Sequence, residues 1–166
     1  MQQPSLLKHI RDILLLPFTV TVIIPYLVYK SDQKFFIDNI IIKVFGLFFL
    51  IAGLALFAWT VYLFRVFGKG TLAPWTPTQN LVVRGPYKYC RNPMISGVFF
   101  VLLGETLILN SIKILIVTSI FFLINTIYFI LKEEPDLRIR FGKEYDAYKN
   151  NVPRWIPKLK PYSKPE

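Results

Sequence analysis

Two adjacent acidic residues, Glu133 and Glu134, directly follow a long apolar run and begin the charged C-terminal part of the chain. Arg91 ends a basic segment that precedes another apolar run, and Tyr87 lies four residues before it. Carboxylates bind ammonium groups or sugar hydroxyls, a guanidinium pairs with a carboxylate, and aromatic rings contact flat or cationic groups. These residue types therefore suit a charged small ligand with an amino-acid part and an aromatic part. Further candidates for the same roles are Arg84, Tyr89 and Tyr145.

Each of these groups also has a purely structural interpretation. The acidic pair can stabilise the N-terminal end of a helix, where carboxylates interact favourably with the helix dipole. The basic residues can bind lipid phosphates, and the tyrosines can form an interfacial belt. The residue types alone leave both interpretations open.

The composition favours a membrane protein over a nucleic-acid-binding protein. The 166 residues are 54% hydrophobic, which exceeds the usual share in soluble domains. The net charge of +10 suits either nucleic acid or the anionic face of a membrane, and the hydrophobicity favours the membrane. The chain has a single cysteine, Cys90, and a single histidine. We therefore expect no disulfide within the chain and no metal site.

Apolar runs at 13–29, at 40–64 and on both sides of a short polar break within 94–131 are each long enough, or nearly so, to cross a bilayer. The sequence thus predicts an all-α, polytopic membrane protein with four transmembrane helices. We expect a single membrane domain over residues 1–166, with its two N-terminal spans in residues 13–64.

The basic residues predict how these spans are oriented. The N-terminus, the segment 65–93 and the C-terminal segment are basic, and with four spans all three lie on one side. The positive-inside rule makes that side cytoplasmic. We therefore expect both termini in the cytoplasm and a cytosolic ligand pocket formed by the C-terminal half of the chain.

The start of the C-terminal segment has the pattern of an amphipathic helix. Four apolar or aromatic residues follow at spacings of four, four and three, namely Leu137, Phe141, Tyr145 and Tyr148. This spacing places them on one helical face. We expect a cytosolic C-terminal helix that rests on the interface or closes over a pocket.

The stretch from residue 79 to 157 resembles a known family. It reads QNLVVRGPYKYCRNPMISG, then a helical hairpin over 94–131, then KEEPDLRIRFGKEYDAYKNNVPRWIP. These elements are similar to the core of the isoprenylcysteine carboxyl methyltransferase and phospholipid methyltransferase group. The pattern of that group is G-x-Y-x-x-x-R-H-P-x-Y-x-G, a hairpin, E-E, F-G-x-E-Y-x-x-Y and V-P-x-x-x-P.

The resemblance implies an enzyme that transfers a methyl group from S-adenosylmethionine to a lipophilic acceptor that enters from the bilayer. It implies cofactor contacts from ten positions: Gln79, Leu81, Val82, Tyr87, Asn92, Pro93, Met94, Ile95, Glu133 and Glu134. Arg91 and Glu133 are the catalytic candidates, and Arg154 is a candidate for binding an acidic substrate headgroup. Membrane lipids are the other expected partners.

Two positions depart from the family pattern. Asn92 replaces the usual histidine and Ile95 replaces the usual tyrosine. Asparagine keeps a hydrogen-bond donor and an acceptor but does not titrate near neutral pH, so a proton-shuttling role is lost at this position.

The acceptor stays open between the carboxyl of an isoprenylcysteine-like substrate, the amine of a phospholipid-like substrate and another lipid-like group. Two other classes also remain. Sterol reductases resemble the same core but bind a nicotinamide dinucleotide phosphate, and a non-catalytic membrane protein could keep the fold. Binding of S-adenosylhomocysteine or of NADPH separates these classes.

Overall fold

The computed structural model describes residues 11, 14–29, 39–69 and 78–163. Within these ranges the chain forms helices and turns and contains no β-strand. The prediction of an all-α protein is confirmed for this part of the chain. The helices in chain order are η1 (Leu14–Ile23), α2 (Ile24–Tyr29), α3 (Ile40–Leu63), η2 (Phe64–Gly68), η3 (Gly85–Lys88), α4 (Pro93–Leu109), α5 (Ile112–Tyr128), η4 (Phe129–Glu133), α6 (Glu134–Phe141) and α7 (Lys143–Asn151).

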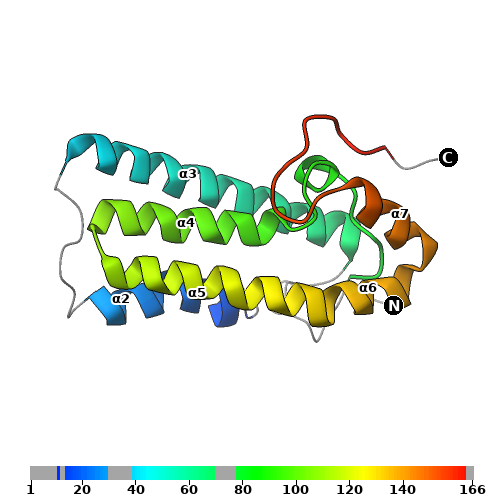
Figure 1. Ribbon diagram of the computed structural model, residues 1–166, viewed down its shortest axis with the longest axis horizontal. Coiled ribbons are helices and arrows are strands. Elements are labelled where there is room, and N and C mark those ends of the chain that lie inside the picture. Colours follow the sequence, from blue (N-terminus) through cyan, green and yellow to red (C-terminus); the bar gives the residue numbers. More distant parts are fainter. Residues whose placement is uncertain (1–10, 12–13, 30–38, 70–77, 164–166) are drawn as a thin grey trace.

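The long helices lie side by side and form an elongated bundle (Figure 1). Helix α4 lies between α3 and α5, and α2 and η1 pack beside α5 and α4. Helices α6 and α7 and the C-terminal loop gather at one end of the bundle (Figure 1). That end carries most of the charged side chains, and the rest of the bundle is mainly apolar, with Lys43, Glu105 and Lys113 as its charged residues among those described.

Glycines bring α3 and α4 into close contact. A Cβ atom at Gly53 would lie 2.7 Å from the carbonyl oxygen of Gly97, and one at Gly104 would lie 2.6 Å from the backbone nitrogen of Leu50. Any side chain at these positions would push the two backbones apart. Small residues allow this close approach in membrane helices, where van der Waals packing drives association.

The predicted hairpin between α4 and α5 is present, with its turn at the predicted break. Asn110 ends α4 in the left-handed conformation, with a φ of 53°. Ser111 caps α5, because its hydroxyl accepts a hydrogen bond from the backbone N–H of Ile114 at 3.1 Å. Asparagine and serine are the residue types preferred at these two positions.

Among the described residues, two continuous helices are long and apolar enough to cross a membrane, Ile40–Gly68 and Ile112–Phe141. Two shorter apolar helices, Leu15–Tyr29 and Pro93–Leu109, accompany them. The second long helix changes character at Lys132, where charged residues begin. Since charges are expensive in hydrocarbon, its last turns lie outside the apolar layer. The four-span count and the single-domain boundaries stay predictions.

The C-terminal region differs from the single helix that the sequence predicts. Helix α6 continues α5 and η4, and Gly142, with a φ of 52°, separates it from α7. A glycine adopts this conformation without the steric cost that a side chain brings. The predicted apolar stripe nevertheless packs together, in a cluster of Tyr145, Tyr148, Val152 and Tyr162 that Leu137 and Phe141 also contact.

Candidate functional site

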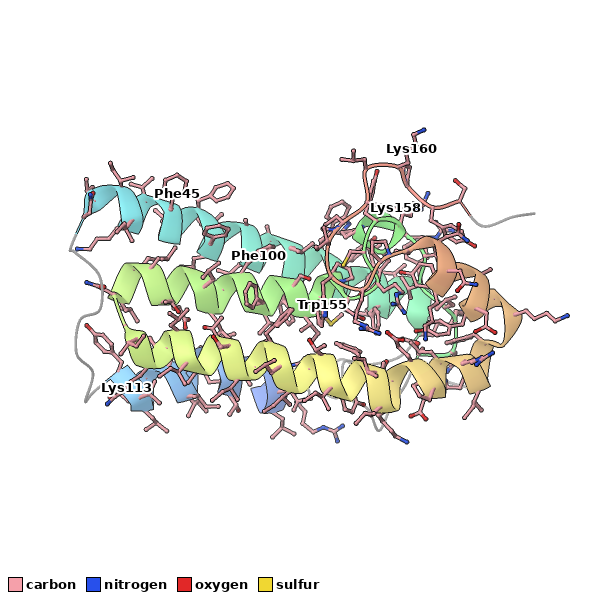
Figure 2. All side chains as sticks on the ribbon, viewed as in Figure 1. Phe45, Phe100, Lys113, Trp155, Lys158 and Lys160 are labelled. Carbon is pink, nitrogen blue, oxygen red and sulfur yellow. The ribbon has the colours of Figure 1, made fainter. Side chains whose placement is uncertain are left out.

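A cavity of about 880 Å³ runs from the charged end of the bundle into its apolar part. Its polar end is lined by residues of the 78–92 segment, of η4 and α6, and of α7. Side-chain oxygen and nitrogen atoms gather at this end of the molecule (Figure 2). The volume falls within the range of small-molecule and cofactor sites.

The other end of the cavity is apolar and reaches the side of the bundle. Helix η1 lines it with Leu16, Pro17 and Val20, and α5 lines it with Ile120 and Ile124. Several of these side chains are also exposed to the outside, with 60% of Ile124 and 41% of Leu16 accessible. The apolar end is therefore lined by residues of η1 and α5 that also form part of the lateral surface of the bundle.

Glu134 is the centre of a buried ion-pair cluster. Its Oε1 lies 3.0 Å from Nη1 of Arg91 and 2.7 Å from Nε of Arg154, and its Oε2 lies 2.8 Å from Nζ of Lys149. Burial raises the pKa of the Glu134 carboxyl, but the hydrogen bonds from Arg154 and Lys149 and the charge of Arg91 bring this pKa below its ordinary value. Glu134 thus stays ionised and ties α6 to α7 and to the turn before α4.

Glu133 is in a different position from its neighbour. Among the described residues it accepts a hydrogen bond from the Tyr128 hydroxyl at 3.4 Å and forms no ion pair. Burial, the largest effect, raises the pKa of its carboxyl. It ends η4, a π-helical turn, and such turns occur frequently at functional sites. Glu133 is therefore the carboxylate that can accept a cation or a hydroxyl from a ligand.

Two buried donors at the cavity lack a partner within the described part of the chain. The hydroxyl of Tyr87 and the Nε of Arg91 are both buried and form no hydrogen bond. Both residues line the cavity. Burial, followed by the nearby Tyr148 and Cys90, raises the pKa of Tyr87 well above its ordinary value, so its hydroxyl keeps its proton. Unsatisfied buried donors are costly, and a ligand acceptor would remove that cost.

Other contacts hold these groups in place. The ring of Tyr87 stacks on Phe64 at 5.5 Å, and its backbone oxygen accepts a hydrogen bond from the Tyr148 hydroxyl at 2.7 Å. The Tyr145 hydroxyl accepts a hydrogen bond from Nη1 of Arg91 at 3.3 Å. Burial, then the charge of Glu134, raises the pKa of Tyr145 to about 12. The polar end is thus preorganised by neutral hydroxyls and one ionised carboxylate.

Most of the residues selected from the sequence come together at this cavity. Ten line it: Leu81, Val82, Tyr87, Arg91, Asn92, Met94, Ile95, Glu133, Glu134 and Tyr145. Arg84, Tyr89 and three others do not line it. Gln79 is exposed, Pro93 is buried at the first position of α4, and Arg154 pairs with Glu134. The predicted ligand roles themselves stay proposals.

The sequence analysis missed the walls contributed by η1 and α5. Asn125 and Tyr128 line the cavity from inside the apolar run of α5, together with Phe121. Their spacings of four and three place them on one helical face. This periodicity is visible in the sequence and could have identified them. No comparable signal marks Leu16 or Val20.

Fold and cavity together define a helical protein whose ligand site joins a charged end to an apolar end at the side of the bundle. A family model described as phospholipid methyltransferase matches residues 41–144, more than half of the chain, and the chain belongs to this family. The match includes nearly all of α3 and the helices up to α6, with Arg91, Glu133 and Glu134 of the polar end, but not η1, Tyr145, Tyr148 or Arg154. No curated protein and no solved structure matches the chain. Membership implies a membrane-bound methyltransferase that acts on lipid-like substrates.

Proposed function

We propose that this protein transfers a methyl group from S-adenosylmethionine to a lipophilic acceptor at the cytosolic face of a membrane. The observation that supports this most directly is that one cavity joins a charged end to an apolar end lined by partly exposed residues of η1 and α5. A water-soluble, charged cosubstrate suits the first end. The tail of a lipid acceptor suits the second, and the two meet near Asn125, Tyr128 and Glu133.

The residues present fit the cosubstrate. The free donors of Tyr87 and Arg91 suit its carboxylate, and the carboxylate of Glu133 suits its ammonium group or its ribose hydroxyls. Leu81 and Val82 offer apolar surface for the adenine. Glu134 already forms ion pairs with three cations, Arg91, Lys149 and Arg154. We propose that Glu134 positions Arg91, and that Arg154 acts through Glu134 and does not bind substrate.

The bound cosubstrate would supply an electrophilic methyl group on a sulfonium sulfur. This chain would contribute binding, orientation and exclusion of water, which carry most of the rate in an in-line displacement. A carboxylate acceptor needs no base. An amine acceptor must lose its proton before it attacks the methyl group.

The same proposal includes a four-span topology with the N- and C-termini in the cytoplasm. The two shorter apolar helices lie beside the two long ones (Figure 1). This arrangement supports a bundle whose helices cross the membrane together. The charged end, with α6 and α7, would then face the cytosol, where the cosubstrate is available.

Calorimetry on the purified protein in detergent tests the proposal. We expect S-adenosylhomocysteine to bind and NADPH not to bind. Tyr87→Phe removes a hydroxyl that has no partner in the described part of the chain, so it should leave folding intact and weaken S-adenosylhomocysteine binding by about 1 kcal/mol. Tyr89→Phe is the matched control, since Tyr89 does not line the cavity. A wild-type protein that binds NADPH, or neither ligand, would refute the proposed function.

A further inference from the structure

We propose that the C-terminal loop, residues 156–161, anchors the protein to anionic phospholipid at the membrane interface. Two large apolar side chains in this loop are almost fully exposed, Ile156 at 80% and Leu159 at 97%. Isolated exposed apolar residues are common on protein surfaces. Here, however, both belong to one short loop whose position is fixed on either side, next to the apolar helices.

The residues on both sides of the loop hold it in place. Trp155 packs against Phe122 and Phe129 of the α5–η4 helix, with ring centroids 5.0 Å and 5.7 Å apart. At the other end Tyr162 is buried, and its backbone N–H donates to the carbonyl oxygen of Lys88 at 2.9 Å. Within the loop the N–H of Lys158 donates to the carbonyl oxygen of Tyr89 at 3.1 Å. The exposure of Ile156 and Leu159 is therefore imposed by the fold and not by a loose chain end.

These contacts also place the loop at the depth of the membrane interface. Phe122 and Phe129 belong to the apolar part of the second long helix, so Trp155 lies beside that part and not beyond it. The turn to which the loop is hydrogen-bonded contains Gly85, which lies next to Trp59 of α3, and 54% of Trp59 is exposed. Exposed tryptophans of this kind mark the headgroup level.

The charge of the loop selects the kind of lipid. Lys158 and Lys160 alternate with the apolar residues, and residues 152–163 contain no acidic side chain. Lys160 is exposed at the outer edge of the loop, whereas Lys158 is half-buried and its Nζ lies 5.5 Å from the ring centroid of Tyr162 (Figure 2). Apolar insertion combined with lysines at the headgroups is the pattern that binds anionic lipid surfaces. Zwitterionic lipid would satisfy the apolar residues alone.

Fluorescence of an environment-sensitive probe tests this anchor without reference to methyl transfer. The probe is attached to Leu159→Cys in the full-length protein, in nanodiscs of phosphatidylcholine alone or of an equimolar mixture with phosphatidylglycerol. Cys90 is buried, and wild type treated with the same probe measures its background labelling. Asn150→Cys on α7 is the control position, because it is exposed but lies outside the loop.

We expect the probe at position 159 to shift to shorter wavelength and to be quenched by nitroxide-labelled lipid, most strongly with phosphatidylglycerol. The probe at position 150 should stay in water in both discs. Lys160→Gln should lower the ratio of inserted to water-exposed probe in the anionic discs by about fivefold, the equivalent of about 1 kcal/mol for one basic residue near such a surface. A probe at 159 that stays in water in both discs overturns the anchor. Equal insertion in both discs, unchanged by Lys160→Gln, overturns its selectivity for anionic lipid.

Discussion

Replacing the two adjacent glutamates one at a time separates structure from ligand binding. Glu134→Gln removes the negative charge that Arg91, Lys149 and Arg154 share, whereas Glu133→Gln removes a carboxylate that forms no ion pair among the described residues. The two changes are chemically identical and affect neighbouring positions. Because only Glu134 forms ion pairs with these cations, we expect Glu134→Gln to lower the stability of the protein. We expect Glu133→Gln to lower its affinity for the ligand.

The structure sets the size of each effect. The side chains of Lys149 and Arg154 are 42% and 26% exposed, so water compensates much of what they lose, and each contributes at most about 1 kcal/mol. Arg91 is only 10% exposed, and its charge would be left buried without a counter-charge, which costs about 3–5 kcal/mol. We expect Glu134→Gln to lower the free energy of unfolding by about 3 kcal/mol, since the amide oxygen can still accept one hydrogen bond.

Glu133→Gln should leave stability within about 0.5 kcal/mol and weaken S-adenosylhomocysteine binding by about 1.5–3 kcal/mol, the range for a lost hydrogen bond to a charged group. Tryptophan fluorescence during thermal unfolding in detergent measures the first quantity, and calorimetry measures the second. If Glu133→Gln instead destabilises the protein and leaves affinity unchanged, then Glu133 stabilises the helix and does not contact the ligand.

The remaining predictions concern one cavity residue, the acid response and the topology. If Asn92 only orients the ligand by hydrogen bonding, Asn92→His should preserve or improve the affinity for S-adenosylhomocysteine, and Asn92→Ala should weaken it by about 1 kcal/mol. Calorimetry measures these affinities. Equal affinity for wild type and both variants would contradict this role. The pKa of Glu134 in the folded state lies below the ordinary value of 4.5, so its ion pairs stabilise the protein fully above that pH and progressively less as the pH falls through the lower, folded-state pKa. Thermal unfolding measured as the pH falls from above 4.5 through the folded-state pKa should therefore show a loss of stability in wild type. Glu134→Gln, which lacks this carboxylate, should not show that loss. Cysteines introduced at Ser163 and Asn39 should be labelled from opposite sides of the membrane, and position 163 should react only from the cytoplasm. Labelling of position 163 from outside would show that the predicted topology is wrong.

The sequence predicted the fold best where one physical rule dominates. The apolar run over 40–64 corresponds to α3, Ile40–Leu63, because apolar length alone decides such a helix. Asn110 and Ser111 marked the hairpin turn because they interrupt the apolar run, and in the structure they end α4 and cap α5. The break at Gly142 was missed because the apolar stripe continues with helical spacing on both sides of it. A tertiary cluster then keeps both halves packed although the helix itself ends.

The site was predictable as a set of residues but not as a set of roles. Nothing local distinguishes Glu133 from Glu134, since both follow the same apolar run. The difference arises from Lys149 and Arg154, which lie 15 and 20 residues further along the chain. Because α7 folds back toward α6, both residues pair with Glu134 and neither pairs with Glu133. The wall formed by η1 was missed for a similar reason. Its contact with the cavity depends on packing between distant segments, which a single sequence does not reveal.

The glycine contact between α3 and α4 has a consequence for how this protein can diversify. A Cβ atom at any of these glycines would lie within 3 Å of a backbone atom of the other helix. Almost any substitution there would therefore separate the two helices. Helix η1, which also lines the cavity, contains no glycine and so has no such backbone contact to preserve. We therefore expect relatives that accept lipids of different shape to keep these glycines and to vary η1, so that natural selection for a new acceptor acts mainly on the N-terminal helix.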